Sequence, residues 1–173
     1  PATIIFAERT DYHIDGYGND AGALDLDGDG KPEIFGTVNG PDEISVFKNT
    51  SVPGTASFAA KIDLPTGSWP STVSAGDLDG DSKADLVVSN ANSGGISFFK
   101  NNSSVGSLAF SPKTDIATGG SVFGNGINDL NGDGKPDLYV PNFNSGTLSL
   151  LANNSTSGTI SFQPKSDISV ADH

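Results

Sequence analysis

Oxygen-bearing side chains recur at fixed spacing in three nine-residue stretches of the chain. The stretches begin at residues 25, 77 and 129, so each copy is shifted by 52 residues from the one before it. Positions one, three, five and nine of every copy carry a carboxylate, except for one amide in the third copy. These residues are Asp25, Asp27, Asp29 and Glu33, then Asp77, Asp79, Asp81 and Asp85, and finally Asp129, Asn131, Asp133 and Asp137. A loop that turns back on itself would bring the four groups of each copy around one point.

This arrangement predicts a calcium ion in each loop. Carboxylates that converge repel one another by roughly 1 kcal/mol per pair even at the dielectric constant of water, so a cation must offset the repulsion. Calcium accepts about six to eight oxygen ligands in a flexible geometry, whereas magnesium demands a near-ideal octahedron. The expected cofactor is therefore Ca²⁺, about three ions in all. We also expect the backbone carbonyl of position seven to be a ligand, with its side chain in water, which concerns Lys31, Lys83 and Lys135.

Two departures from the repeat predict that the loops bind calcium unequally. Ser82 replaces the glycine of position six, where a positive φ costs a serine roughly 1 kcal/mol. Asn131 replaces an aspartate, which removes one negative charge from the third loop. We therefore expect the first loop to bind calcium most tightly. The alternative to a metal site is an ordinary Asp-Gly or Asn-Gly hairpin turn, which accounts for only one or two acids per loop.

The 52-residue period extends over nearly the whole chain and predicts a repeat architecture. A period of this size is typical of propellers, solenoids and arrays. The 22 glycines and 10 prolines favour short strands joined by many turns. Aromatic, basic and amide positions recur with the same shift, namely Phe6, Phe58, Phe110 and Phe162, then Arg9, Lys61, Lys113 and Lys165, and finally Asn49, Asn101 and Asn153.

Each period is expected to form four antiparallel strands. In the middle copy these strands are residues 72–76, 85–90, 96–99 and 108–115, and the acidic loop closes the first hairpin. Strand 85–90 begins with consecutive apolar residues after its acid, so we expect both of its faces to be covered. The predicted fold is all-β, with three four-stranded antiparallel β-propeller blades. A four-stranded solenoid is the alternative.

The chain, 1–173, is interpreted as a single propeller segment. Its parts are blades at approximately 12–63, 64–115 and 116–168, a surplus outer strand at 1–11, and the lead-in to a further blade at 169–173. Three blades are fewer than the roughly four to eight of a closed ring. We therefore expect further blades as partners, either on the same chain or in a homo-oligomer.

The acidic loop resembles that of the FG-GAP or VCBS repeat family, which includes the propeller blades of integrin α chains. The resemblance is carried by the pattern Asp-x-Asp/Asn-x-Asp-Gly-x-x-Asp in a hairpin loop, repeated in phase. An EF-hand loop is similar only in its first half, because it closes with a glutamate at position twelve between helices. The resemblance implies a propeller fold, bound calcium, and extracellular adhesion or recognition. It does not identify the ligand.

The composition disfavours several classes of function. A net charge of −12 disfavours nucleic acid and anionic membrane surfaces as partners. The absence of cysteine excludes disulfides, thiolate metal sites and a cysteine nucleophile. No apolar run approaches the roughly 18 residues of a membrane-spanning helix, and the N-terminus lacks the features of a signal peptide. Because methionine is absent, we expect either a removed leader or a piece of a longer chain.

Catalytic side chains are scarce, so we expect no enzymatic activity. The two histidines, His13 and His173, form no catalytic pattern with serine and aspartate. Recognition should instead use the segments that differ between copies, just before each acidic loop, where Tyr17 and Trp69 share a column with Ser121. An exposed tyrosine or tryptophan is a common platform for sugars and partner proteins. Packing between blades is the alternative that we favour for either aromatic side chain.

The sequence as a whole predicts a non-enzymatic calcium-binding module located outside the cell or at its surface. Calcium there reaches millimolar levels and can fill modest sites that cytosolic levels would leave empty. The expected role is adhesion or recognition, with an extracellular protein or a glycan as ligand. The alternatives are a carbohydrate-binding lectin, and a structural spacer or accessory domain of a larger secreted or surface protein.

Overall fold

The computed structural model describes residues 9–170 of the 173-residue chain. Within this range the chain forms β-strands and no helix, and hence none long and apolar enough to cross a membrane. The strands are β1 (Tyr17–Leu24), β2 (Glu33–Asn39), β3 (Glu43–Phe47), β4 (Ile62–Pro65), β5 (Pro70–Gly76), β6 (Asp85–Asn90), β7 (Gly95–Phe99), β8 (Thr114–Ala117), β9 (Gly126–Asn128), β10 (Asp137–Asn142), β11 (Thr147–Leu151) and β12 (Ser166–Ser169).

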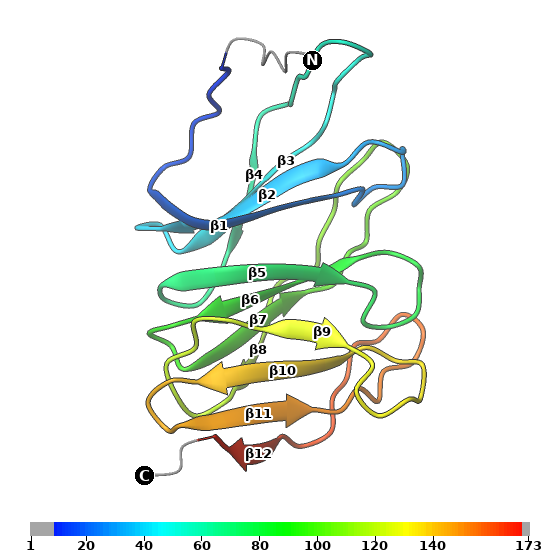
Figure 1. The fold of residues 1–173 in the computed structure, drawn as a ribbon. Coiled ribbons are helices and arrows are strands. Elements are labelled where there is room, and N and C mark those ends of the chain that lie inside the picture. The colour runs from blue at the N-terminus through cyan, green and yellow to red at the C-terminus, as the bar shows by residue number, and fades with distance from the viewer. Residues whose placement is uncertain (1–8, 171–173) are drawn as a thin grey trace, which may run out of the picture.

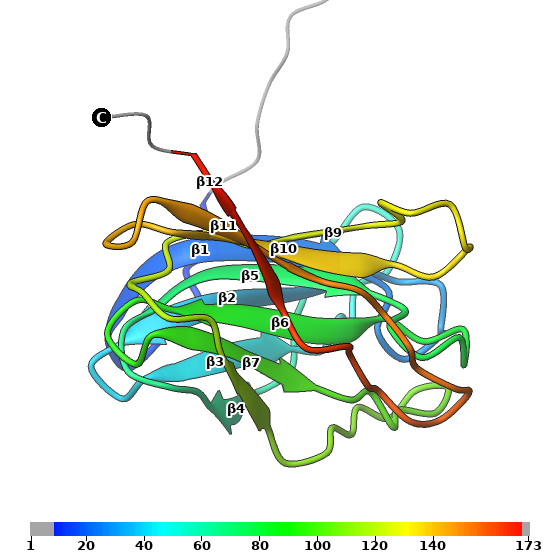
Figure 2. The same cartoon turned by 90° about the horizontal axis from the view of Figure 1, so that it is seen from below.

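The strands form three antiparallel four-stranded sheets, and the spatial order in each sheet is the chain order. The first sheet contains β1 to β4, the second β5 to β8 and the third β9 to β12. Figure 1 shows the sheets stacked face to face in chain order, with β1, β5 and β9 along the same side of the stack. Figure 2, the view from below, places β4 at the opposite side. The first strand of each sheet therefore lines one edge of the stack.

The all-β prediction and the four-stranded repeat are confirmed. In the second sheet, the expected strands 72–76, 85–90 and 96–99 correspond to β5, β6 and β7. The fourth strand, expected at 108–115, instead lies at Thr114–Ala117 as β8. The reason is local, because Phe110 pairs with Asn101 in an isolated bridge and the chain between this bridge and β8 leaves the sheet.

Closure of the sheets into a propeller ring is not confirmed, because the described sheets form an open stack (Figure 1). The expected blade boundaries stay predictions. Most of the surplus strand expected at 1–11 lies outside the described residues, and so does most of the lead-in expected at 169–173.

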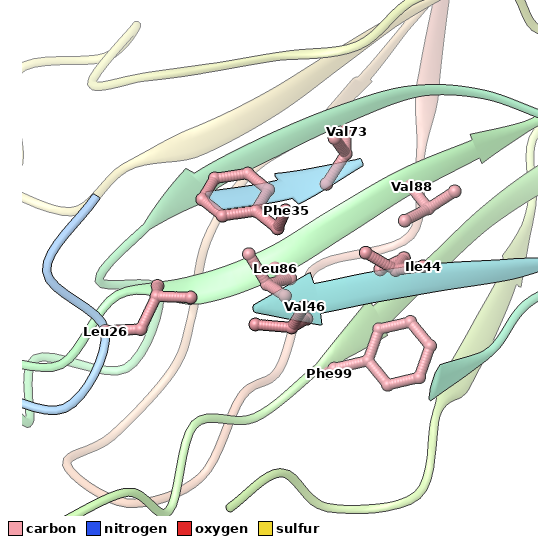
Figure 3. Close-up of a cluster of buried hydrophobic side chains, with 8 residues drawn as sticks. All are labelled: Leu26, Phe35, Ile44, Val46, Val73, Leu86, Val88 and Phe99. Carbon is pink, nitrogen blue, oxygen red and sulfur yellow. The ribbon is translucent and has the colours of Figure 1, made fainter. Parts of the chain in front are cut away.

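Apolar side chains fill the two spaces between neighbouring sheets. The cluster between the first and second sheets, drawn in Figure 3, consists of Leu26, Phe35, Ile44, Val46, Val73, Leu86, Val88 and Phe99. The cluster between the second and third sheets consists of Leu78, Val87, Ile96, Phe98, Val122, Leu138, Val140 and Leu151. Every member of the first cluster except Val73 has its counterpart 52 residues later in the second. Burying each such side chain contributes roughly 1.5–3 kcal/mol. We call the packing of two neighbouring sheets through such a cluster a joint, and the chain uses the same joint twice.

The strand β6 serves both joints. Leu86 and Val88 face the first cluster, whereas Val87 between them faces the second. Every residue of β6 is buried, which confirms the expectation that consecutive apolar residues mark a strand covered on both faces.

A repeated asparagine adds polar bonds to each joint. Asn101 donates from Nδ2 to the carbonyl oxygens of Leu26 (2.8 Å) and Ala84 (2.9 Å), and so connects the first acidic loop to the second sheet. Asn153 donates in the same way to Leu78 (2.8 Å) and Pro136 (2.7 Å). Because Leu26 and Leu78 occupy position two of their acidic loops, each loop is fixed to the sheet that follows it.

Candidate metal centre

The three acidic loops connect the first and second strands of their sheets. They join β1 to β2, β5 to β6 and β9 to β10, and Figure 1 shows all three at the right-hand end of the stack. The stack therefore presents a row of three acidic loops along one edge.

The first loop folds around its own carboxylates. Asp25 accepts backbone N–H bonds from Gly28 and Gly30, each at 2.8 Å. Asp27 accepts the N–H of Asp29 at 3.1 Å, and Asp29 in turn accepts the N–H of Lys31 at 2.9 Å. One oxygen each of Asp25, Asp27 and Asp29 lies within 4.8 Å of the other two. The loop thus brings together the three acids that the sequence predicted to converge.

The acid at position nine has a structural role in every copy. Glu33 is completely buried, and its two carboxylate oxygens accept the N–H groups of Leu26 (2.8 Å) and Asn49 (3.2 Å). Asp85 and Asp137 accept the corresponding pairs of N–H groups. These acids hold the start of the loop to the end of the third strand. Their predicted role as metal ligands stays a prediction.

Asp85 also lies close to other acids of its loop. One of its oxygens lies within 4.8 Å of oxygens of Asp77 and Asp79. Burial raises the pKa of Asp85 to about 6, although the N–H groups of Asn101 and Leu78 act in the opposite direction and Asp79 acts in the same one. Ionising Asp85 in the folded protein therefore costs free energy, and a bound cation would reduce this cost.

Two lysines that sequence reasoning missed bind the acids of the first and second loops. The ammonium group of Lys48 binds Asp27 and lies 3.2 Å from Asp29. Lys100 binds Asp79 at 2.5 Å and Asp81 at 2.7 Å. The side chains of Asp27 and Asp79 are fully buried in these pairs. Each ammonium group is a cation supplied by the chain itself to the acids at positions three and five.

The third copy lacks this lysine. Ala152 stands 52 residues after Lys100, and Asn131 stands 52 residues after Asp79. A lysine is therefore present where position three is an acid and absent where it is an amide. This covariation was readable from the sequence, and it is the signal that would have found Lys48 and Lys100.

The electrostatics of the loops follow these contacts. For Asp29, burial raises the pKa, but hydrogen bonds from the Lys31 N–H and from Lys48 outweigh it, so the pKa lies below its usual value. For Lys100, burial lowers the pKa, but Asp79 and Asp81 raise it more, so the ammonium group stays charged. These contacts thus favour the charged forms of the Asp29 carboxylate and the Lys100 ammonium group.

The third loop is more open. Residues 128–135 are exposed, and within the described chain no three acids of this loop approach one another as those of the other two loops do. N–H groups of Gly134 and Gly132 lower the pKa of Asp129. Lys135 donates to the carbonyl oxygen of Ser155 at 2.7 Å, so its side chain does not simply extend into water as expected.

A model of the FG-GAP-like repeat matches residues 25–88 and again residues 84–140. The chain belongs to the FG-GAP-like repeat family. The two matches together contain all three acidic loops, so the family assignment made from the loop pattern is confirmed. No curated protein and no solved structure matches the chain.

The donor set of this FG-GAP-like chain fits a hard cation. All side-chain donors that converge are carboxylate oxygens, which are the ligands that calcium prefers. Lys48 and Lys100 bind carboxylate oxygens of Asp27 and Asp79, so these oxygens already face a positive charge. The expected carbonyl ligands Lys31, Lys83 and Lys135 lie two residues after position five. Their N–H groups donate to the acids of that position, Asp29, Asp81 and Asp133.

The two aromatic residues proposed for ligand binding lie away from the acidic loops. Tyr17 begins β1 and Trp69 precedes β5, so both lie at the other end of the first strands. Tyr17 is 81% exposed and Trp69 is 50% exposed. Phe123, in the variable segment before the third acidic loop, is also exposed and forms an edge-to-face pair with Phe143, with ring centroids 5.7 Å apart. Sequence reasoning missed Phe143.

Replacing Ser82 by glycine is expected to raise the free energy of unfolding by about 0.5–1 kcal/mol. Ser82 has a φ of 69°, which confirms the expected left-handed conformation and which only glycine adopts without cost. The melting temperature without metal should rise by about 2–3 °C. The reverse change, Gly30→Ser at the equivalent position of the first loop, is the control and should lower it. Equal melting temperatures for both variants and the parent would contradict this account.

Proposed function

We propose that this chain is a calcium-stabilised, non-enzymatic module of β-propeller type. One observation carries the proposal, namely that acids converge in the same loop of successive sheets and already bind a cationic side chain there. Bound calcium would supply the positive charge that lets several carboxylates share one loop. The residues that would hold it are the acids of positions one, three and five, together with the carbonyl group of position seven and the acid of position nine. The fold then depends in part on the metal.

Calcium is expected to raise the melting temperature of the protein, and a chelator is expected to lower it. A site at one hundred times its Kd contributes about 2.7 kcal/mol to the folded state, which corresponds to roughly 5–10 °C per site for a chain of this length. Thermal melts in calcium, in magnesium and in EDTA measure the effect.

A matched pair of variants separates a site effect from a charge effect. Asp77→Asn removes the first acid of the second loop, and Asp167→Asn removes one exposed acid on β12. Only the first change should reduce the calcium-dependent shift. If EDTA leaves the melting temperature of the parent protein unchanged, the calcium function is refuted.

The proposed setting is extracellular or at the cell surface, where the module would support adhesion or the recognition of a protein. Two facts support this setting. The family assignment suggests an integrin-like module, and the calcium concentration outside cells would fill even modest sites that cytosolic levels leave empty. A role as spacer in a larger surface protein uses the same stabilisation and no ligand. Cell-adhesion assays with the immobilised protein, with and without calcium, distinguish the two.

A second candidate function is carbohydrate binding. It is favoured by the exposed aromatic side chains at the end of the stack remote from the acidic loops. Trp69 has a φ of 60°, and its backbone is held by bonds from its N–H to Asp42 (3.0 Å) and from the N–H of Ala91 to its carbonyl (2.9 Å). A strained backbone fixed in this way often belongs to a binding site. Since Trp69 is the single tryptophan, its fluorescence should change with a bound glycan, and Trp69→Ala should abolish any signal on a glycan array.

A further inference from the structure

The two end faces of the stack carry the two halves of the joint that holds the sheets together. In both internal joints, one half consists of a loop leucine and three strand residues of the leading sheet. The other half consists of three strand residues of the following sheet that recur with the period, together with Val73 in the first joint and Val122 in the second. The outward faces of the third and first sheets repeat these halves, each without its complement.

The outward face of the third sheet repeats the leading half. It consists of Leu130, Tyr139, Leu148 and Leu150, which follow Leu78, Val87, Ile96 and Phe98 by 52 residues. Leu130 is 50% exposed and Tyr139 36%, whereas Leu78 and Val87 are at most 1% exposed. The face therefore leaves open to solvent the positions that the internal joints bury.

The outward face of the first sheet repeats the following half. Ile34, Gly36 and Phe47 precede Leu86, Val88 and Phe99 by 52 residues. They line a cavity of about 550 Å³. Gly36 stands where the other two copies have Val88 and Val140, so the following half of the joint is smaller at this position of the first sheet.

The hydrogen bonds of the joint are also split between the two faces. Asn49 is the first-sheet counterpart of Asn101, but its Nδ2 donates only to Pro32, at 2.7 Å. Within the described chain its second amide hydrogen has no acceptor. The carbonyl oxygen of Leu130, which corresponds to that of Leu26, likewise has no donor there. One donor and one acceptor of the same repeated bond are therefore left at opposite ends.

We infer that the third sheet of one molecule docks on the first sheet of a second copy, through the same joint that packs the sheets within the chain. The contact is head to tail, so it closes a ring if the rotation fits and otherwise continues as a filament. Two copies would join six sheets, which lies within the roughly four to eight blades of closed propellers. The inference does not depend on calcium binding.

One segment must be rearranged in this contact. Residues 10–13 precede β12 by three periods, and Tyr12 packs edge to face on Phe47 and Phe58 with ring centroids 5.9 and 5.3 Å apart. This is the place that Ile168 of a docking β12 would take. Residues 10–13 form no strand. Their displacement by β12 of the second copy would therefore break no strand pairing.

Sedimentation velocity of the 173-residue protein from 1 to 100 μM tests the contact. A dimer or larger ring is expected, and Tyr139→Lys should weaken association at least tenfold. Val105→Lys places the same charge at a residue that is 77% exposed in the loop between β7 and β8, and it should have no effect. A parent protein that stays monomeric at 100 μM overturns the inference.

Mixing two variants tests the head-to-tail geometry. Ile34→Lys blocks the first-sheet face and Tyr139→Lys blocks the third-sheet face, so each variant alone should be monomeric. An equimolar mixture should form a one-to-one dimer through the two unblocked faces. Association that is insensitive to Ile34→Lys would mean that two third sheets meet, which also overturns the inference. Melting temperatures of both variants establish that they are folded.

Discussion

Replacing Asn101 by alanine is expected to lower the free energy of unfolding by about 3 kcal/mol. Asn101 is completely buried and makes three bonds, since Nδ2 donates to Leu26 and Ala84 and Oδ1 accepts the N–H of Ser103 at 2.9 Å. Each bond contributes about 1 kcal/mol, and the abandoned carbonyl groups stay desolvated. For a chain of this length the melting temperature should fall by about 6–12 °C.

The repeat supplies the control for this prediction. Asn49 makes the same bonds within its own sheet, to Pro32 and from Ser51, but lacks the bond across a joint. Asn49→Ala should therefore cost about 1 kcal/mol less than Asn101→Ala in the monomer. Asn102 is exposed, and its side-chain amide donates only to Ser111, so Asn102→Ala should be nearly neutral. Urea denaturation in the Tyr139→Lys background measures all three, and equal losses for Asn49 and Asn101 would contradict the role assigned to the joint.

The sequence was sufficient for the elements that depend on local pattern. Three of the four expected strands of the second copy and its acidic loop follow from alternation, turn residues and the period, all of which act over a few residues. The strand expected at 108–115 was wrong because Phe110 pairs with Asn101 in an isolated bridge and the strand begins only at Thr114, which the alternation of residue types did not reveal. Closure of a ring depends on the rotation between sheets, which no local pattern encodes.

The candidate site was predictable in its acids but not in its balance of charge. The spacing of Asp25, Asp27 and Asp29 was enough to place them together. Lys48 was missed because it follows the last residue of β3, and only the pairing of β2 with β3 brings it close to the loop. The double use of Glu33 as acceptor for Leu26 and Asn49 also required the fold. The spacing of residues within one loop does not predict the contacts that the loop makes with distant parts of the same repeat.

Replacing Lys100 by alanine is expected to affect stability and calcium binding in opposite directions. Without metal, the buried carboxylate of Asp79 loses its partner, and the free energy of unfolding should fall by about 2 kcal/mol, since a hydrogen bond to a charged group contributes about 1.5–3 kcal/mol. With calcium, the second loop should bind more tightly, because the ammonium group no longer occupies the same carboxylates.

The gain in calcium affinity should be about tenfold to thirtyfold. A unit charge and a divalent ion on the order of 4 Å apart repel by about 2 kcal/mol even in water. Titration calorimetry in a background with Asp25→Asn and Asp129→Asn isolates the second loop. Lys113→Ala is the matched control, since it removes a charge that pairs with Asp115 on β8 and leaves the loop alone. An unchanged or weaker affinity in Lys100→Ala would show that lysine and calcium do not compete.

The third loop permits the reciprocal experiment. In each of the first two loops, four acids and the lysine that binds them sum to a charge of −3. The three acids of the third loop give the same sum without such a lysine. The expected ranking, with the first loop tightest, considered the acids and the strain at Ser82 but not the lysines. Ala152→Lys should lower the calcium affinity of the third loop, and adding Asn131→Asp should bring it to the level of the first. If Ala152→Lys leaves the affinity unchanged, the lysine column controls the stability of the loops and not their occupancy.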